Sequence, residues 1–552
     1  MSTQHAHLHG STKGQGTERS QIVKRETVFQ IIGFGLVAIG YLASTVFVLQ
    51  RKTAHLEKPN QITLRIAHWQ LEQGLRHAFD ELATEFTRQH PDIRVEQLLV
   101  PERIFPNWLV TQLIGGTAPD LIEVGYGIDD ERLARYFVPL SLWVERPNPY
   151  NQGTALEKLP WRDTFLDGMY SSYNPTLQDY YSAGLNMHTV RLYYNRGLYE
   201  KIMGVGAPAP TNFREFQAVF QKLADYNGAR ANKVVAIAGS DYNGPLLLDQ
   251  FLSNQTQKLL LRLNDLLDFS VSKPDTQMAY LAGRWNFTSP EVQSGLELQH
   301  EVGRNLPSGF QSLRREDATF YFLQERALMI VSGSWDVRTL KAQAPFPIDI
   351  VSIPLPTPAN PEYGKYVLGA FAENNDVATR FGITRLSRHP KAALAFLQFM
   401  TSQRGNQRFV DTSYWLPSII GVTIPEPIRA FQPIIEGYTQ GLAFNSFGAD
   451  GRLVINQNLY RLYGDRQPVD SFTRSLEEDL RPAVRRDLLQ EIKTRRHAIA
   501  HDDTTLAALQ WKQYRGKSSS ETVRKMAATR LNQDLMECGA YMLETSLDSI
   551  QK

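Results

Sequence analysis

The residues best suited to contact a ligand are aromatic and polar side chains that follow predicted strands. Trp335 comes after a Ser-Gly-Ser turn that ends the apolar run 327–331, and Trp69 and Gln70 come after the apolar run 62–67. An indole ring can stack on the apolar face of a ligand ring while nearby polar groups fix the orientation of the ligand. Packing beside a turn is the commoner role of such a tryptophan, so the surrounding elements have to decide between the two roles.

Further candidate contacts lie in turns and at strand ends. Ser240 and Tyr242 can donate hydrogen bonds to a polar ligand. Trp285 and Trp415 can stack on a ring. The remaining candidates are Gly125, Tyr126, Ser334 and Gly369. For each of these residues, packing in the core or within a loop is the alternative role.

Alternating strands and helices are expected to position the first group of candidates. Strands at 62–67, 93–100 and 121–124 are separated by helices at 75–88 and 108–114. Helix 75–88 carries apolar residues at helical spacing, which predicts one buried face. Strands that alternate with helices form parallel sheets, and ligands bind such sheets at the carboxyl ends of the strands.

A second series of elements is expected to position the remaining candidates. Its predicted strands are 190–195, 234–238, 327–331 and 348–353. Asn212 and Glu215 have the spacing of a helix N-cap and its partner three residues later, so a helix is expected to begin there. A strand at 380–383 and a helix from Pro390 follow. The pattern predicts an α/β fold with two such units.

The composition is that of a globular protein with more than one core. The chain has 552 residues, of which 42% are hydrophobic and 21% are charged. The net charge of +2 gives no reason to expect a nucleic-acid partner. Cys538 is the only cysteine, which excludes a disulfide within the chain and a thiolate metal site.

No catalytic motif is complete. Gly516-Lys517-Ser518 resembles the end of a P-loop, but Trp511 occupies the position of the first glycine. His300-Glu301 begins a zincin motif, but Arg304 replaces its second histidine. We therefore expect a protein that is not an enzyme and holds no cofactor or metal ion. A pair of carboxylates that meets only in the folded chain would still permit a carbohydrate-active hydrolase.

The N-terminal region contains a segment of transmembrane length. Residues 28–49 are predominantly apolar and carry no charge. We expect a bilayer anchor at 28–50, preceded by a polar tail at 1–27 and followed by a linker at 51–61. Lysines and arginines flank the segment on both sides in similar numbers, so charge alone does not orient it.

Several sequence runs occur in the order found in one protein family. They are ITLRIAHWQ, FDELATEFTRQHPDIRVEQ, GGTAPDLIEVG, RLYYNRGLYEKIMG, PAPTNFREF, FLQERALMIVSGSWDV, and SRHPKAALAFLQFMTSQRGNQRFVDT before YWLPS. The chain resembles the family 1 extracellular solute-binding proteins, the maltose-binding-like receptors of ABC transporters. The resemblance covers residues 62–480 and leaves out the predicted anchor and the C-terminal end.

The resemblance implies a type II-like periplasmic binding protein with two α/β lobes joined by hinge crossovers. Lobe one would comprise 62–185 and 370–432, and lobe two 186–369 and 433–485. Trp69 and Trp335 match positions that commonly line the ligand site of the family. The implied function is to capture a mono- or oligosaccharide between the lobes and deliver it to the permease subunits of an ABC transporter.

The resemblance also implies an orientation. The polar tail would be cytoplasmic, the single anchor would lie in the inner membrane, and the lobes would face the periplasm or the extracellular side. A sugar sensor that signals to another membrane protein is the alternative binding function.

Residues 486–552 are expected to form a helical extension that the family lacks. Residues 467–488 resemble the closing helix of these receptors. A second long helix is predicted by an apolar stripe on which Cys538 would be buried. The stripe consists of Val523, Ala527, Leu531, Leu535, Cys538 and Met542. This helix either packs back on a lobe or docks on a transporter subunit or another partner.

Overall fold

The computed structural model describes residues 61–551, apart from 126–127, 175–176, 229, 266, 268–270, 374–376, 465–466 and 518. The predicted polar tail, bilayer anchor and all but the last residue of the linker therefore lie outside the described residues. Within the part that is described, no helix is both long enough and apolar enough to cross a membrane.

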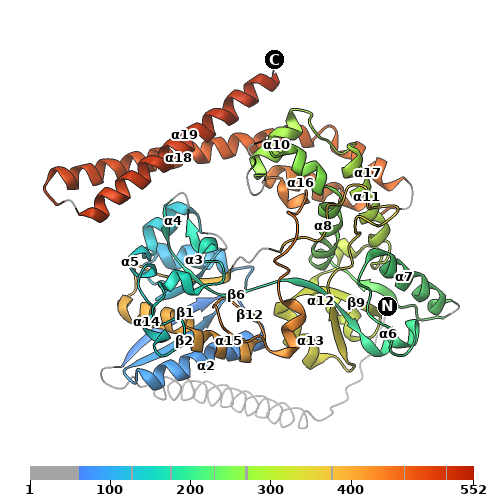
Figure 1. Ribbon diagram of the computed structural model, residues 1–552, viewed down its shortest axis with the longest axis horizontal. Coiled ribbons are helices and arrows are strands. Elements are labelled where there is room, and N and C mark those ends of the chain that lie inside the picture. The colour runs from blue at the N-terminus through green and yellow to red at the C-terminus, as the bar shows by residue number, and fades with distance from the viewer. Residues whose placement is uncertain are drawn as a thin grey trace, which may run out of the picture. The chain divides into compact units, whose positions relative to one another are not determined.

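Lobe one is built on a six-stranded sheet with the order β12-β6-β11-β3-β1-β2 (Figure 1). The strands are β1 (Ile62–His68), β2 (Ile93–Leu99), β3 (Leu121–Val124), β6 (Ala183–Met187), β11 (Ala378–Ile383) and β12 (Leu416–Pro417). β1 pairs with β3 in parallel, with Ile66 opposite Leu121. β11 is antiparallel to both β3 and β6, so a late segment of the chain completes the middle of this sheet.

Helices cover the lobe-one sheet. They are α2 (Gln73–Gln89), α3 (Phe105–Ile114), α4 (Asp130–Tyr136), α5 (Ser141–Val144), α14 (Pro390–Met400) and α15 (Gln403–Ser413). Short 3-10 turns η1 (Pro149–Asn151), η2 (Trp161–Thr164) and η3 (Tyr170–Ser172) and the hairpin β4 (Tyr173–Asn174) and β5 (Asp179–Tyr180) lie between them in the chain. Phe86 of α2 meets Phe396 of α14 edge to face, with ring centroids 5.0 Å apart. The predicted apolar face of α2 is therefore confirmed as a core face.

Lobe two is built on a four-stranded sheet with the order β10-β7-β9-β8. The strands are β7 (Val190–Asn195), β8 (Val235–Ala238), β9 (Ala327–Gly333) and β10 (Ile348–Val351). β8 and β9 are parallel, whereas β7 is antiparallel to both β9 and β10. All seven residues of β9 are buried, as expected for a central strand with helices on both faces.

Lobe two contains the helices α6 (Arg196–Met203), α7 (Phe213–Asn227), α8 (Asn243–Gln255), α9 (Gln257–Leu263), α10 (Lys273–Leu281), α11 (Pro290–Gly303), α12 (Arg315–Leu323) and α13 (Val337–Gln343). The start of α7 is the one that the sequence predicts from Asn212. Asn212 caps α7, since its Oδ1 accepts a hydrogen bond from the Glu215 backbone N–H (3.1 Å). The Glu215 carboxylate accepts from the backbone N–H and hydroxyl of Thr211. The predicted N-cap at Asn212 is confirmed. The Glu215 carboxylate bonds to Thr211, the residue before the cap.

The connections between the two sheets are tied together by one buried arginine. Arg191, at the start of β7, donates to both carboxylate oxygens of Glu373 (2.5 and 2.9 Å). It also donates to the carbonyl oxygens of Ala430 (3.0 Å) and Gln432 (3.1 Å). Its side chain is only 3% exposed. Three segments distant in sequence therefore meet at one guanidinium.

A helical subdomain extends lobe two. It follows the turn η6 (Glu426–Phe431), which lies against β7, and contains the 3-10 turns η7 (Phe444–Ser446) and η8 (Leu459–Arg461) and helices α16 (Ala449–Asn458) and α17 (Pro468–Leu476). These elements share a hydrophobic cluster with α10, α11 and the first turns of α18 (Leu480–Tyr514). The predicted single helix over 467–488 is therefore wrong, because the chain turns between α17 and α18 at residues 477–479.

The C-terminal extension is a helical hairpin of α18 and α19 (Ser520–Gln551), which run side by side (Figure 1). α18 belongs to the hydrophobic cluster of lobe two through Leu480, Val484 and Leu488 and continues beyond it without a break. The predicted start of the extension at residue 486 thus falls inside a helix.

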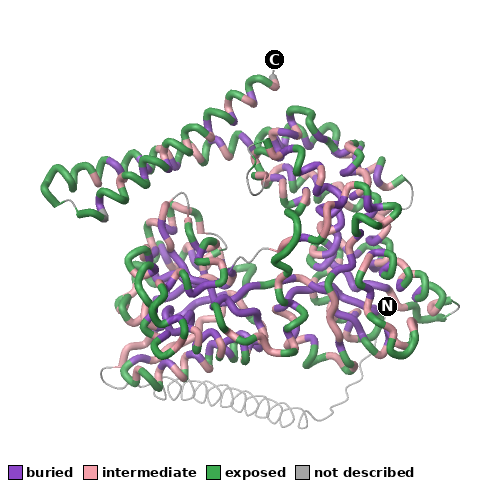
Figure 2. The backbone as a smooth tube through the Cα atoms, in the orientation of Figure 1, coloured by how far each residue is buried: buried purple, intermediate pink, exposed green. Residues whose placement is uncertain are grey.

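The predicted apolar stripe of the last helix is exposed, and this expectation is corrected. Leu531 is 61% exposed, Leu535 is 62% exposed, and Cys538 is exposed as well. The face that is buried carries Thr522, Thr529, Asn532, Ala540, Leu543 and Leu547. Polar contacts to α18 select this face, including a buried hydrogen bond from Asn532 to Asp502 (2.9 Å). Figure 2 shows that exposed residues, in green, recur along both helices.

Candidate functional site

In lobe one, the strand ends are organised around a buried carboxylate. Glu123 of β3 is fully buried and accepts hydrogen bonds from Gln70 Nε2 (2.7 Å) and the Trp69 backbone N–H (3.3 Å). These bonds fix the segment that follows β1. The Trp69 ring packs edge to face on Phe105, with centroids 4.9 Å apart. A Cβ atom at Gly125 would lie 3.3 Å from that ring.

In lobe two, the turn after β9 presents Trp335. Its ring covers the backbone of Gly333, where a Cβ atom would lie 2.1 Å from the nearest ring carbon. Ser332 Oγ donates to Asp336 Oδ2 (2.5 Å), which fixes the turn η5 (Ser334–Asp336). The other edge of the Trp335 ring faces His188 at a centroid distance of 5.6 Å. Because residue 333 has no side chain, the indole ring can lie directly over its backbone.

The two lobes meet through an arginine of α12. Arg315 forms an ion pair with Asp336 (2.7 Å) and lies 3.8 Å from Glu72, which precedes α2 in lobe one. Its guanidinium also lies over the Tyr242 ring, 5.0 Å from the centroid. Burial raises the pKa of Glu72, and the positive charge of the nearby Arg315 offsets this increase only in part.

The end of α15 belongs to the same region. Arg338 Nη1 donates to the Thr412 carbonyl oxygen. A Cβ atom at Gly74 would lie 2.7 Å from Arg338 Cδ and 2.9 Å from the Ser413 carbonyl oxygen. Trp415 follows two residues later and is buried. The starts of α2 and α13 and the end of α15 therefore lie together.

Three buried polar atoms of this region have no hydrogen-bond partner among the described residues. They are Glu72 Oε2, Ser334 Oγ and Trp335 Nε1. A buried polar atom without a partner is costly, and a ligand that supplies the missing partner removes that cost. The set contains an acceptor, a hydroxyl and an N–H donor, which together suit a ligand with several hydroxyl groups.

The remaining predicted residues lie in other environments. Trp285 is 2% exposed, donates its Nε1–H to the Thr276 carbonyl oxygen (2.9 Å) and packs in the helical subdomain, so its expected role as a ligand contact is corrected to a core role. Ser240 is buried and its hydroxyl donates to Asn243 Oδ1 (2.8 Å), which occupies it in the turn before α8. Tyr126 lies outside the described residues.

Gly369 lies in the connection between β10 and β11. Its backbone N–H and carbonyl oxygen both pair with the Gln257 side chain, at 3.4 and 3.2 Å. A Cβ atom there would lie 2.6 Å from the Tyr438 ring. This glycine therefore permits close packing at a crossover.

Sequence reasoning missed the charged residues of the site. Glu123 interrupts an apolar strand, and that interruption was the available signal. Arg315, Asp336 and Glu72 have no comparable signal, because their pairing depends on how the two lobes meet. In the described part of the chain, no group of three or more histidine, cysteine or acidic residues could hold a metal ion.

The buried carboxylate of Glu123 is expected to make the stability of the fold depend on pH. Burial raises the pKa of Glu123 to about 8, despite the bonds from Gln70 and Trp69 that favour the charged form. The folded protein then binds one more proton than the unfolded chain between about pH 4.5 and pH 8, so this group lowers stability as the pH rises through that window. Glu123→Gln should flatten this decline in urea midpoints measured across it. An unchanged pH profile would contradict the prediction.

Comparison with known proteins identifies the family. The model of the bacterial extracellular solute-binding protein family matches residues 72–407. The chain belongs to this family. Solute-binding proteins are also its curated relatives. A multiple sugar-binding protein of Streptococcus mutans is 23% identical over 68% of this chain and 80% of its own length. An uncharacterized ABC transporter extracellular-binding protein of Pyrococcus horikoshii is 22% identical over 70% of this chain and 79% of its own length.

Solved structures of solute-binding proteins share the two-lobed fold. The raffinose complex of the binding protein RafE superposes with a TM-score of 0.52 at 15% identity, covering 77% of this chain and all of that one. A chitin oligosaccharide binding protein superposes with a TM-score of 0.52 at 17% identity, covering 77% of this chain and 99% of its own. At these identities the likeness establishes the fold, and the ligand has to be argued from the site.

Proposed function

We propose that this solute-binding protein captures a mono- or oligosaccharide between its two lobes and delivers it to an ABC transporter permease. The observation that carries the proposal is a set of unpaired buried atoms in the region where Arg315 joins the lobes: Glu72 Oε2, Ser334 Oγ and Trp335 Nε1. The sugar-binding names of one relative and of several structural neighbours support the same ligand class.

The chemistry of a pyranose matches this set. One face of the sugar ring is lined by C–H groups and can stack on an indole, while its hydroxyls both donate and accept hydrogen bonds. Hydroxyls of the sugar would donate to Glu72 and accept from Trp335 Nε1. Arg315, which contacts residues of both lobes, would hold the lobes together over the ligand. Closure of the lobes would then bury the sugar and create the surface that a permease recognises.

Tethering to the membrane is part of the proposal. Residues 28–50 would form the single anchor in the inner membrane, with the polar tail in the cytoplasm and the lobes in the periplasm. A tethered receptor stays near its permease, so that delivery does not depend on free diffusion.

Calorimetry of the full-length chain in detergent against a panel of mono- and oligosaccharides tests the ligand class. We expect a saccharide to bind with a dissociation constant of about 1 μM, which corresponds to a binding free energy of about −8 kcal/mol. Product analysis of the same mixtures should recover the saccharide intact. Released shorter sugars would instead establish a hydrolase.

Binding of another ligand class would contradict the carbohydrate assignment. If no saccharide binds, and a polyamine or metal chelate binds in a way that depends on Trp335, the carbohydrate assignment is wrong. Co-purification with permease subunits after crosslinking in the presence of the sugar separates transport from sensing, because a sensor would be captured with a different membrane protein.

A further inference from the structure

Helix α8 carries a carboxylate that has no partner. Asp249 makes no hydrogen bond or ion pair with any described residue. The neighbouring Leu247 and Leu248 are packed in the lobe-two core. Burial raises the pKa of Asp249 to about 7, and no nearby cation lowers it. Asp249 is half-buried, so its carboxylate loses hydration without gaining a positive partner among the described residues, and a ligand that supplies this partner would remove the cost.

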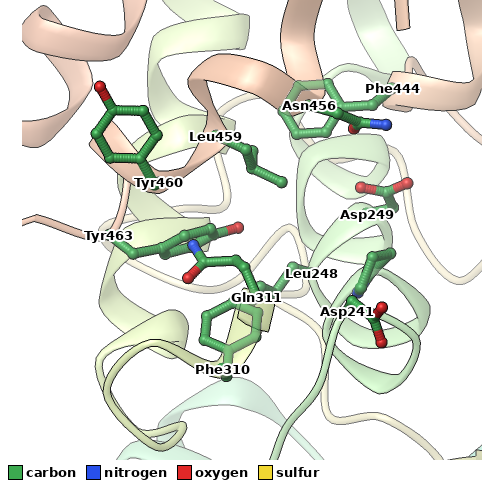
Figure 3. Close-up of a pocket in the computed structure, with 11 residues that line it drawn as sticks. Asp241, Leu248, Asp249, Phe310, Gln311, Phe444, Asn456, Leu459, Tyr460 and Tyr463 are labelled. Carbon is green, nitrogen blue, oxygen red and sulfur yellow. The ribbon is translucent and has the colours of Figure 1, made fainter. Parts of the chain in front are cut away.

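The Asp249 carboxylate faces a cavity of about 300 Å³ (Figure 3). The cavity lies between α8, the turn η4 (Phe310–Ser312) and the α16–η8 segment. Its lining residues fall within 241–311 and 444–463, and none of them belongs to the interlobe set around Trp335. It is therefore a separate pocket of lobe two, close to the lower size limit of small-ligand sites.

Aromatic rings form much of the wall opposite Asp249. Tyr463 and Phe310 pack edge to face with centroids 5.1 Å apart, and Tyr460 is 59% exposed. Figure 3 shows the Tyr463 hydroxyl and the Asp249 carboxylate directed into the same space. Burial, reinforced by the Asp249 charge, raises the pKa of Tyr463. Gln311 Nε2, also at the wall, is buried without a hydrogen-bond partner among the described residues.

We propose that this cavity binds a small organic cation, an alkylammonium or quaternary ammonium group. A cation would supply the positive partner that the Asp249 carboxylate lacks. The aromatic rings offer the faces to which such cations are attracted. A hydroxyl on the same ligand could accept from Gln311 Nε2. A neutral polyol would leave the carboxylate charge uncompensated, so the pocket differs in ligand class from the proposed saccharide site.

Calorimetry of the full-length chain with choline tests the proposal. Choline should bind with a dissociation constant of about 1 mM or lower. Its uncharged isostere, 3,3-dimethylbutan-1-ol, should bind at least tenfold more weakly, because only the charge differs. This comparison needs no variant and so does not depend on how a substitution folds.

Two matched substitutions locate the site. Asp249→Asn should weaken choline binding at least tenfold, whereas Asp225→Asn on α7 should leave it unchanged, because Asp225 is exposed and does not line the cavity. Saccharide binding should persist in both variants, which separates this pocket from the interlobe site. Choline affinity should also rise as the pH increases through 7, since Asp249 has to lose its proton to pair with the cation. The other ionisable groups at the wall are Asp241, Tyr460 and Tyr463.

The proposal is overturned by any of three results. They are no choline binding at about 10 mM, equal affinities for choline and its isostere, or an Asp249→Asn variant that binds choline as the wild type does.

Discussion

Replacement of Trp335 by alanine is expected to weaken saccharide binding more than tenfold, a loss of about 1.4 kcal/mol or more. The indole supplies both the stacking face and the unpaired Nε1 donor, so its removal takes away two interactions with the ligand. Its ring is only partly buried and lies over Gly333 rather than inside a core cluster. The fold should therefore persist, and calorimetry with the best saccharide measures the loss.

Trp511→Ala is the matched control. Trp511 lies on α18 and is 60% exposed, so the same substitution there should leave the affinity unchanged. Gly333→Ala should reproduce part of the Trp335→Ala defect, because its Cβ atom would occupy the place of the ring. If Trp335→Ala retains full affinity while its melting temperature falls, the tryptophan is a packing residue and the proposed site has to be moved.

Arg191→Ala is expected to destabilise the protein by about 3 to 5 kcal/mol, the usual result of removing one partner of a buried ion pair. The guanidinium joins Glu373 to the carbonyl oxygens of Ala430 and Gln432. Its loss removes the donor to both carbonyl oxygens and leaves the Glu373 carboxylate with the Ile434 backbone N–H but no positive partner. Because these segments connect the two sheets, ligand affinity should fall together with stability. Urea unfolding followed by circular dichroism measures the first effect, and calorimetry measures the second.

Arg284→Ala provides the comparison for Arg191. Arg284 also pairs with a carboxylate, Asp265, but the two side chains are 41% and 63% exposed. Exposed pairs contribute about 0 to 1 kcal/mol, so this variant should unfold close to the wild type. Equal losses from the two substitutions would show that the Arg191 cluster is no more important than a surface ion pair.

Much of the fold could be predicted because it follows local patterns. Strands β1, β3, β7 and β9 begin at the predicted residues, since each is an apolar run bounded by turn residues. The order of these runs also carried the family resemblance. Asn212 was placed at a helix start from its spacing alone, and it caps α7.

The remaining features depend on which surfaces meet. The stripe through Leu531 and Leu535 has helical spacing, yet periodicity does not say whether a partner covers it. α19 instead buries the face on which Asn532 reaches Asp502. Trp285 follows a turn, as Trp335 does, but its N–H is satisfied by Thr276 inside a hydrophobic cluster. In the same way, Glu72 and Arg315 pair across more than two hundred residues, where no sequence pattern connects them.

The length of α18 has a mechanical consequence. Its 35 residues span about 52 Å, and its first turns are fixed in the core of lobe two. A hinge rotation of about 10° would therefore displace the C-terminal end of α18 by about 9 Å, as the tip of a lever arm. The hydrogen bond from Gln178 of lobe one to the Ala528 carbonyl oxygen of α19 (2.5 Å) joins the hairpin to lobe one, so such a rotation would break it. The hairpin thus amplifies a small angular change at the hinge into a displacement that paired fluorescent labels could record.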